Sequence, residues 1–364
     1  MKHGILQMAP LVLALLTATS AGADPGNRVE REEKQTVDAA GRTSLVIRNG
    51  SGRTVIVGKA GLDAVSIIAV KTVNGKDNDE AAEILDQLQV EIETHGDKVV
   101  IDTHEDRHGS HGLMSLVKGD RRSAWVDYTI EVPYAFSVDA SASSGDVRIS
   151  NIGGSVAATA TSGNVSVRAV TGGVEARVTS GDLEVAEAGG DLEASATSGN
   201  ITVDNVTGKL QLEATSGDAR VSRIGKDAEV SLTSGNFTLD GCSGSVSFRA
   251  ASGDGTIHEV TGNVDATSSS GNIEVMIVPS AGRIFELSSS SGDIDVLYVA
   301  VKDFGFKLDV QTSSGSIEGD LPIKVSRVDR RRLQGVVGSG AARVDIETAS
   351  GNVSILERTE SATR

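Results

Sequence analysis

The chain has 364 residues, 42 of them glycine, and a formal net charge of −16. Its single cysteine excludes a disulfide scaffold and a cysteine-rich metal site. The acidic balance argues against a nucleic-acid partner, because phosphates require a basic surface. One Trp, three Tyr and six Phe leave little material for an aromatic stacking platform.

Residues 1–23 have the features of a secretory signal peptide. Lys2 precedes an apolar run at 11–16, and Ala21-Gly22-Ala23 has the small-x-small form of a cleavage site. The apolar run is too short to span a bilayer, which takes about 20 residues. We expect cleavage before Asp24, export to the periplasm or the cell surface, and no transmembrane segment in the mature chain. An uncleaved N-terminal anchor is the alternative.

Residues 37–136 lack the periodicity that follows and are predicted to form an N-terminal β-rich cap. Such a cap would cover the unpaired strand edges at the start of a repeat array. A short helix is expected at 79–88, capped by Asn78 or Asp79, with Ala82, Leu85 and Leu88 along one side. Strands are expected at 45–47, 54–57, 66–70, 90–92, 99–101 and 125–132.

A tripeptide repeat dominates the rest of the chain. Ser-Gly-Asp or Ser-Gly-Asn recurs at steps of 18 residues, starting at Ser144, Ser162, Ser180, Ser198, Ser216, Ser234, Ser252 and Ser270. The pattern then loosens, with further Ser-Gly turns at Ser291, Ser314 and Ser350. A fixed period of this length is typical of a solenoid, in which each unit stacks on the next.

The apolar residues fall at fixed places within each unit. When the Ser is position 1, positions 4, 6, 9, 13, 15 and 17 are apolar at 40 of 42 sites in the seven complete units, except at Gly255 and Ser268. Alternation with period two indicates strands that are buried on one face. The sequence therefore predicts an all-β fold: a parallel β-solenoid, or β-helix, of 18-residue coils over 137–356, followed by a polar tail at 357–364.

The third position of the turn alternates between Asp and Asn. In stacked coils these side chains would form a column about 4.8 Å apart, where adjacent carboxylates would repel each other. Intervening Asn residues separate the charges, and their amides could donate to the carboxylates. A calcium ladder is the alternative, although such sites need several converging oxygens per ion. The alternating residues are Asp146, Asn164, Asp182, Asn200, Asp218, Asn236, Asp254, Asn272 and Asp293.

Three stretches make the chain resemble a known family. They are the Ser-Gly-Asp/Asn turns, Val-Asp-Tyr-Thr-Ile-Glu-Val-Pro at 126–133, and Glu-Thr-Ala-Ser-Gly-Asn-Val-Ser-Ile at 347–355. Together they resemble the toastrack family, a domain of unknown function also called the putative-adhesin family, over residues 40–356. The resemblance implies an extracytoplasmic β-repeat domain without established catalytic residues. Some members are linked with envelope-stress systems and carry membrane segments.

Two segments are candidates for binding. His104, His108 and His111 could approach one zinc or copper ion, although a hydrophilic loop is the simpler interpretation. Arg330, Arg331 and Arg332 form the cationic cluster of an acidic protein, either as a solvated loop or as a contact for an anionic polymer or lipid head group. No catalytic residue and no cofactor are predicted.

The sequence favours a non-enzymatic exported protein, an adhesin or a binding scaffold of the cell envelope. Its partner would be an envelope component or a surface polymer. A sensing partner in envelope-stress signalling is the alternative. A polysaccharide-acting β-helix enzyme is less favoured, because the outward positions change from unit to unit and gather no cluster of acids.

Overall fold

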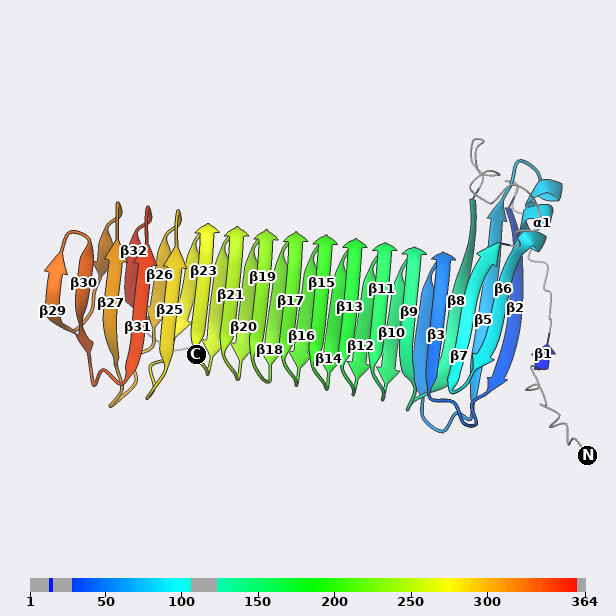
Figure 1. The fold of residues 1–364 in the computed structure, drawn as a ribbon, viewed down its shortest axis with the longest axis horizontal. Helices are drawn as coiled ribbons and strands as arrows, with labels where there is room; N and C mark the ends of the chain where they lie inside the picture. The colour runs from blue at the N-terminus through cyan, green and yellow to red at the C-terminus, as the bar shows by residue number, and fades with distance from the viewer. Residues whose placement is uncertain (1–12, 16–27, 106–122, 359–364) are drawn as a thin grey trace, which may run out of the picture. The chain divides into compact units, whose positions relative to one another are not determined.

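The computed structural model describes residues 13–15, 28–105 and 123–358, and almost all of its regular structure is β-strand (Figure 1). The chain divides into two compact units, Met1–Ser166 and Val167–Arg364. The chain passes from one unit to the other within β12 (Val165–Val170).

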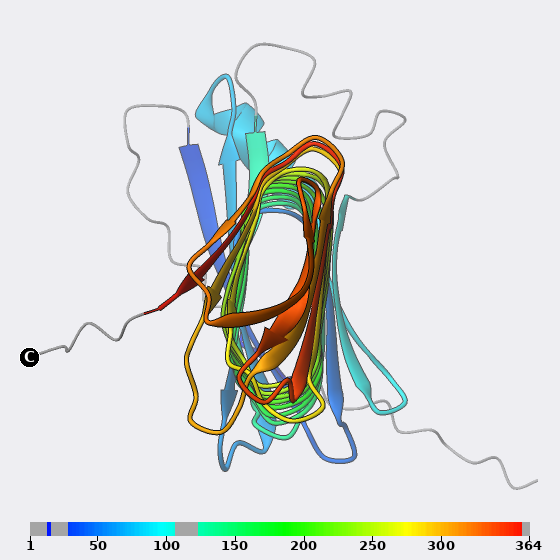
Figure 2. The same cartoon turned by 90° about the vertical axis from the view of Figure 1, so that its left-hand side faces the viewer.

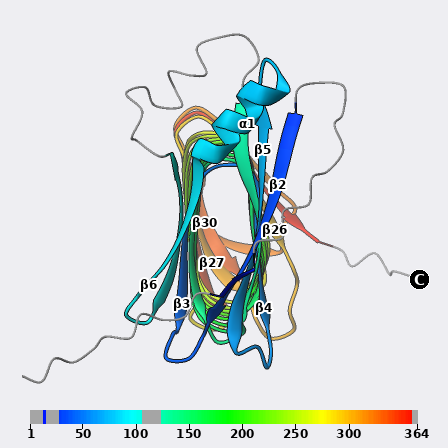
Figure 3. The same cartoon turned by 90° about the vertical axis from the view of Figure 1, so that its right-hand side faces the viewer.

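The first unit contains two sheets and one helix (Figure 3). Neighbouring strands in one sheet follow the order β1-β2-β5-β8-β4-β10, and in the other the order β6-β7-β3-β9-β11. The strands are β1 (Leu13–Leu15), β2 (Arg28–Asp38), β3 (Ser44–Ser51), β4 (Thr54–Lys59), β5 (Ala64–Asn74), β6 (Leu88–His95), β7 (Lys98–Glu105), β8 (Ser123–Pro133), β9 (Ser137–Ser144), β10 (Val147–Ile152) and β11 (Val156–Ser162).

Stacked coils begin inside the segment that the sequence assigns to the cap. β3 pairs in parallel with β9, and β4 pairs in parallel with β10, which places Ser51 beside Ser144. Ser51-Gly52 therefore occupies the same turn as the later Ser-Gly pairs. The 18-residue count misses this coil because β5, α1, β6, β7 and β8 are inserted between it and Ser144.

The predicted helix is present as α1 (Asn78–Gln87), but its cap and its buried face differ from the prediction. Asp77 is the N-cap, and its Oδ1 accepts a hydrogen bond from the backbone N–H of Glu80 at 2.9 Å. The buried residues of the helix are Ala81, Ile84 and Leu85, which pack with Val73. Leu85 and Leu88 are buried as predicted, but Ala82 lies only at the margin of this face, because the helix is rotated slightly relative to the prediction.

The second unit consists of coils with one strand in each of two facing sheets (Figure 2). One sheet contains β14 (Leu183–Ala188), β16 (Ile201–Val206), β18 (Ala219–Ile224), β20 (Phe237–Cys242), β22 (Gly255–Val260), β24 (Ile273–Ile277), β26 (Ile294–Tyr298), β28 (Ile317–Gly319) and β32 (Val353–Glu357). The other contains β13 (Val174–Ser180), β15 (Leu192–Ser198), β17 (Leu210–Ser216), β19 (Ala228–Ser234), β21 (Val246–Ser252), β23 (Val264–Ser270), β25 (Ile284–Ser289), β27 (Phe306–Thr312), β29 (Ile323–Asp329), β30 (Arg332–Val337) and β31 (Ala342–Thr348).

The predicted parallel solenoid is confirmed. Successive strands pair in parallel with their counterparts one coil on, so that Leu192 lies beside Leu210 and Leu210 beside Ala228. All 42 of the predicted inward positions are buried, including Gly255 and Ser268. At Gly255 the Phe248 ring fills the space that a side chain would occupy, so that it would overlap an added Cβ. The same ring stacks on the Phe237 ring, with the two ring centroids 5.0 Å apart.

A left-handed residue explains why position 9 faces inward after positions 4 and 6. Simple alternation would turn position 8 inward and position 9 outward. Position 8 instead has a positive φ, which adds one residue to the strand, as a bulge does, and reverses the alternation. The φ values are 59° at Asn151, 54° at Ala169, 60° at Glu187, 59° at Asn205, 55° at Arg223, 90° at Gly241 and 54° at Glu259.

The turn glycines stack on one another from coil to coil, as Gly199 does on Gly181 and Gly217 on Gly199. From Gly145 to Gly253 these residues have φ between 123° and 139°, a range that L-residues with a Cβ rarely adopt. A Cβ on Gly217 would also overlap the carbonyl oxygen of Gly199. The column therefore accepts only glycine and holds the coils in register.

The last coils do not stack in chain order. β31 pairs with β25 on one side and with β27 on the other, although β27 precedes β31 in sequence. β32 likewise pairs with both β26 and β28. The chain therefore forms the outer coil first and then returns to fill the place beneath it.

Replacing Gly217 with Ala should lower the free energy of unfolding by about 3 kcal/mol, because strain at a positive φ adds to the overlap with Gly199. Gly173→Ala is the matched control, since an added Cβ there lies 3.4 Å from the nearest atom, the Asp191 carbonyl oxygen. Denaturant unfolding of both variants would test this. Equal losses in the two variants would contradict the role assigned to the column.

Val203→Asp should cost about 4 kcal/mol, because it places a charge without a partner in the interior. Val203 is 1% exposed, whereas the adjacent Thr202 points outward. Thr202→Asp should therefore change the melting temperature little. Thermal melts of the two proteins compare the inner and outer faces of one strand, and similar melting temperatures would show that the faces are misassigned.

Candidate functional site

A basic hairpin forms the last two strands of one sheet in the second unit. We use this name for residues 323–337, which comprise β29, β30 and the turn between them. β30 pairs antiparallel with β27, and β29 pairs antiparallel with β30. The hairpin thus departs from the parallel pattern and carries the arginine cluster predicted from the sequence.

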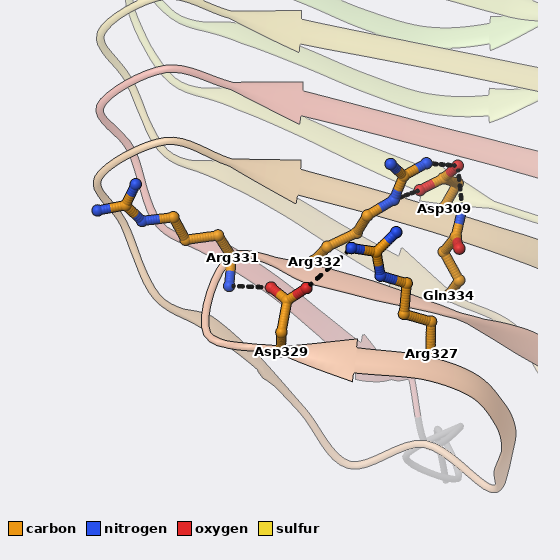
Figure 4. A network of polar contacts seen from close by, with 6 residues as sticks. All are labelled: Asp309, Arg327, Asp329, Arg331, Arg332 and Gln334. Atoms are coloured by element: carbon orange, nitrogen blue, oxygen red, sulfur yellow. Dashed lines mark hydrogen bonds and ion pairs between the residues drawn. The ribbon is translucent and has the colours of Figure 1, made fainter.

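The structure separates the three predicted arginines. Arg332 binds Asp309 of β27 through two hydrogen bonds, Nε to Oδ1 at 3.2 Å and Nη2 to Oδ2 at 2.8 Å. Gln334 Nε2 donates to the same Oδ2 at 2.7 Å (Figure 4). Partial burial of Asp309 opposes its ionisation, but the bonds from Arg332 and Gln334 outweigh that effect and hold the pKa of Asp309 below its ordinary value. Arg332 therefore fastens the hairpin to β27.

Arg330 and Arg331 instead occupy the exposed turn. The backbone N–H of Arg331 donates to Asp329 Oδ1 at 2.9 Å, and Arg327 Nη2 reaches Asp329 Oδ2 at 3.4 Å. The backbone bond from Arg331, followed by the charge of Arg327, lowers the pKa of Asp329. Asp329 thereby shapes the turn, while the Arg331 side chain extends away from it (Figure 4). Within the described part of the chain, the guanidinium groups of Arg330 and Arg331 form no ion pair.

A hollow of about 480 Å³ lies beside this turn. It is lined by the outermost Ser-Gly turn of the coils, at 314–317, and by the hairpin turn. The lining is part apolar and part cationic: Ser314, Gly315, Ser316, Ile317, Val328, Asp329, Arg330, Arg331 and Leu333. Arg330 and Arg331, whose guanidinium groups form no ion pair among the described residues, therefore border a cavity that is lined by both polar and apolar groups.

Two further basic residues lie on the first strand of the hairpin. Lys324 and Arg327 are exposed on β29, on the same strand as the apolar Ile323, Val325 and Val328. The alternation of these residues in the sequence could have indicated a strand between the Ser-Gly turns at Ser314 and Ser350. It was obscured because the register shifts between Val325 and Arg327.

The structure does not test the histidine cluster. His104 lies in β7, opposite Gln89 of β6, and its side chain is not described. His108 and His111 lie outside the described residues. In the parts of the chain that are described, no three His, Cys, Asp or Glu residues are placed to hold a metal ion.

The Asp/Asn column forms a ladder of a different kind from the predicted one. Asp182 Oδ1 accepts from the backbone N–H of Asn200 at 2.9 Å, and Asn200 Oδ1 accepts from that of Asp218 at 3.0 Å. Each side-chain oxygen thus binds the main chain of the next coil. The expectation that Asn amides donate to the carboxylates is replaced by this arrangement, because Asp and Asn both present the oxygen it needs.

Several outward carboxylates are matched with arginines on adjacent coils. Arg168 contacts Glu184 at 3.4 Å, and Arg177 contacts Glu193 at 2.5 Å. Arg249 contacts Asp265 at 3.3 Å. These carboxylates therefore already have a cationic partner on the surface of the coils.

Asp309→Asn should loosen the hairpin, because it removes the charge that binds Arg332. We expect a loss of about 1 kcal/mol, so that trypsin cuts at Arg330 and Arg331 about fivefold faster at neutral pH. Because the folded pKa of Asp309 is lowered, this contribution is complete above about pH 4 and fades as the pH falls through the folded value. Asp240→Asn, at an exposed outward position, is the control and should not change the rate of cutting. Unchanged cutting in Asp309→Asn would refute the fastening role.

Comparison with known proteins places part of the chain in a family. The described residues contain no helix that is long and apolar enough to cross a membrane. No curated protein matches the chain in sequence. The model of the family named Toastrack DUF4097 matches residues 186–356, which includes the basic hairpin.

Solved structures give weaker similarities. A "putative adhesin" from Parabacteroides distasonis is 11% identical, with 90% of this chain and 97% of that chain covered and a TM-score of 0.32. A "putative cell adhesion protein" from Clostridium sporogenes is 11% identical, with 90% and 100% covered and a TM-score of 0.22. A "putative lipid binding protein" from Parabacteroides distasonis is 12% identical, with 92% and 98% covered and a TM-score of 0.26. These scores carry no further argument, and the match of residues 186–356 to the toastrack family model is the similarity that the comparison supports.

Proposed function

We propose that this protein is a non-enzymatic, exported binding scaffold of the adhesin kind, and that the turn of its basic hairpin contacts an anionic polymer of the cell envelope. The observation that carries the proposal is the different use of adjacent arginines. Arg332 is bound to Asp309, whereas Arg330 and Arg331 border an open hollow and form no ion pair among the described residues.

The regular coils support a scaffold role. Their inward residues form the core, and their turn residues form the glycine column and the Asp/Asn ladder. Several of their outward acids form ion pairs with arginines. A chain with a net charge of −16 repels anionic polymers in general. A local pair of arginines at a projecting turn would overcome this repulsion at short range, within a Debye length of about 8 Å.

The proposal is tested with polygalacturonate, a carboxylated polysaccharide, immobilised on a sensor. Arg330→Ser together with Arg331→Ser should weaken binding about tenfold, because two charge contacts are lost. Binding of the wild type should also fall as salt is added.

The matched control is Lys209→Ser with Lys226→Ser, which removes two exposed positive charges from turns elsewhere in the second unit. Binding that weakens equally in both double variants would show that only total charge matters. Absence of wild-type binding at low salt would refute a polyanion contact of this class. Degradation of the polymer by the wild type would refute the non-enzymatic assignment.

A further inference from the structure

The basic hairpin exposes the edge strand of its sheet. β29 pairs with β30 on one side, and it is the last strand in the sheet order. Val325 and Val328 are 49% and 68% exposed, which is high for large apolar side chains. An exposed apolar edge strand presents unpaired main-chain groups that can bind another strand.

The side chains of β29 alternate between an apolar face and a basic face. Ile323, Val325 and Val328 lie opposite Val337, Gly335 and Leu333 of β30 on the face that points toward the coil interior. Lys324 and Arg327 point to the other face. A strand that fits this edge should therefore be apolar on one face and acidic on the other.

The chain itself contains such a strand. β6 is the last strand of a sheet in the first unit and pairs antiparallel with β7. Val90, Ile92 and Thr94 share a face with the buried Ile101 and Val99, and they are themselves half-exposed. Glu91 and Glu93 lie on the opposite, exposed face.

We propose that β29 of one molecule adds to β6 of a second copy and extends the sheet from copy to copy. In antiparallel register Lys324 faces Glu93, Val325 faces Ile92 and Arg327 faces Glu91. The extra residue between Val325 and Arg327 fits this register as a bulge, because the register against β30 shifts at the same place.

Charge favours this pairing over the symmetric alternatives. Two β29 strands related by a two-fold axis bring Lys324 beside Arg327, and two β6 strands bring Glu91 beside Glu93. Like charges on directly opposite residues are destabilising, whereas opposite charges are stabilising. The contact is therefore heterologous, joining two different surfaces, and it can add further copies. It does not rest on the proposed polymer contact, which involves Arg330 and Arg331.

Disulfide trapping between two chains, each with one introduced cysteine, tests the register. Both chains carry Cys242→Val, which removes the buried cysteine and fits a position where adjacent coils have Ile224 and Val260. One chain adds Val325→Cys and the other Ile92→Cys. Oxidation of the mixture should give a linked heterodimer on a non-reducing gel, whereas either chain alone should stay unlinked.

Glu91→Cys in place of Ile92→Cys is the matched control, since its side chain lies on the opposite face. Linking with Glu91→Cys as fast as with Ile92→Cys would overturn the register. Linking of the Val325→Cys chain with itself would favour a symmetric dimer and overturn the proposal, as would a mixture that stays unlinked while thermal melts show both chains folded.

Charge reversal supplies a second readout without cysteines. Lys324→Glu with Arg327→Glu should weaken self-association about tenfold in sedimentation velocity, because two attractive pairs become repulsive. Adding Glu91→Lys and Glu93→Lys to the same chain should restore association. Failure of this rescue would overturn the pairing, and a wild type that stays monomeric at all concentrations would do so too. Polygalacturonate binding is measured separately, so either proposal can fail without the other.

Discussion

The stacked glycine column is the constraint on which the rest of the coil structure depends. Each turn glycine lies so close to the glycine carbonyl of the preceding coil that a Cβ could not fit, and several of these residues also need a positive φ. Because the column fixes the distance and phase between coils, the strands pair in register without a shift. The 18-residue period of the sequence is the spacing at which this contact can recur.

The acidic composition is compatible with this stacking because the charges are used locally. In the turn ladder, an oxygen of Asp or Asn accepts the main-chain N–H of the next coil, and alternation with Asn keeps the carboxylates two coils apart. On the flat faces, arginines bind acids on the adjacent coil, as Arg177 binds Glu193. Many polar groups of the regular faces thus have partners on the adjacent coil, whereas the guanidinium groups of Arg330 and Arg331 form no ion pair among the described residues.

The basic hairpin owes its position to the order in which the last coils are placed. Because β31 and β32 return to lie between earlier and later coils, β27 has one edge that β31 does not cover, and β30 pairs with it there. Asp309 of β27 then finds Arg332 and Gln334 of β30 beside it. The same route leaves β29 at the end of the sheet, where its apolar and basic faces are exposed.

Local periodicity was enough to predict the solenoid, its inward positions and its turns, because each depends on contacts that recur every 18 residues. The arginine cluster could also be found in the sequence, but the different roles of Arg330, Arg331 and Arg332 could not, since they depend on Asp309 more than 20 residues away. The early coil at Ser51, the rotated face of α1 and the inserted position of β31 were likewise decided only by tertiary structure. In each case the partner is distant along the chain, and a repeat period carries information only about its nearest repeats.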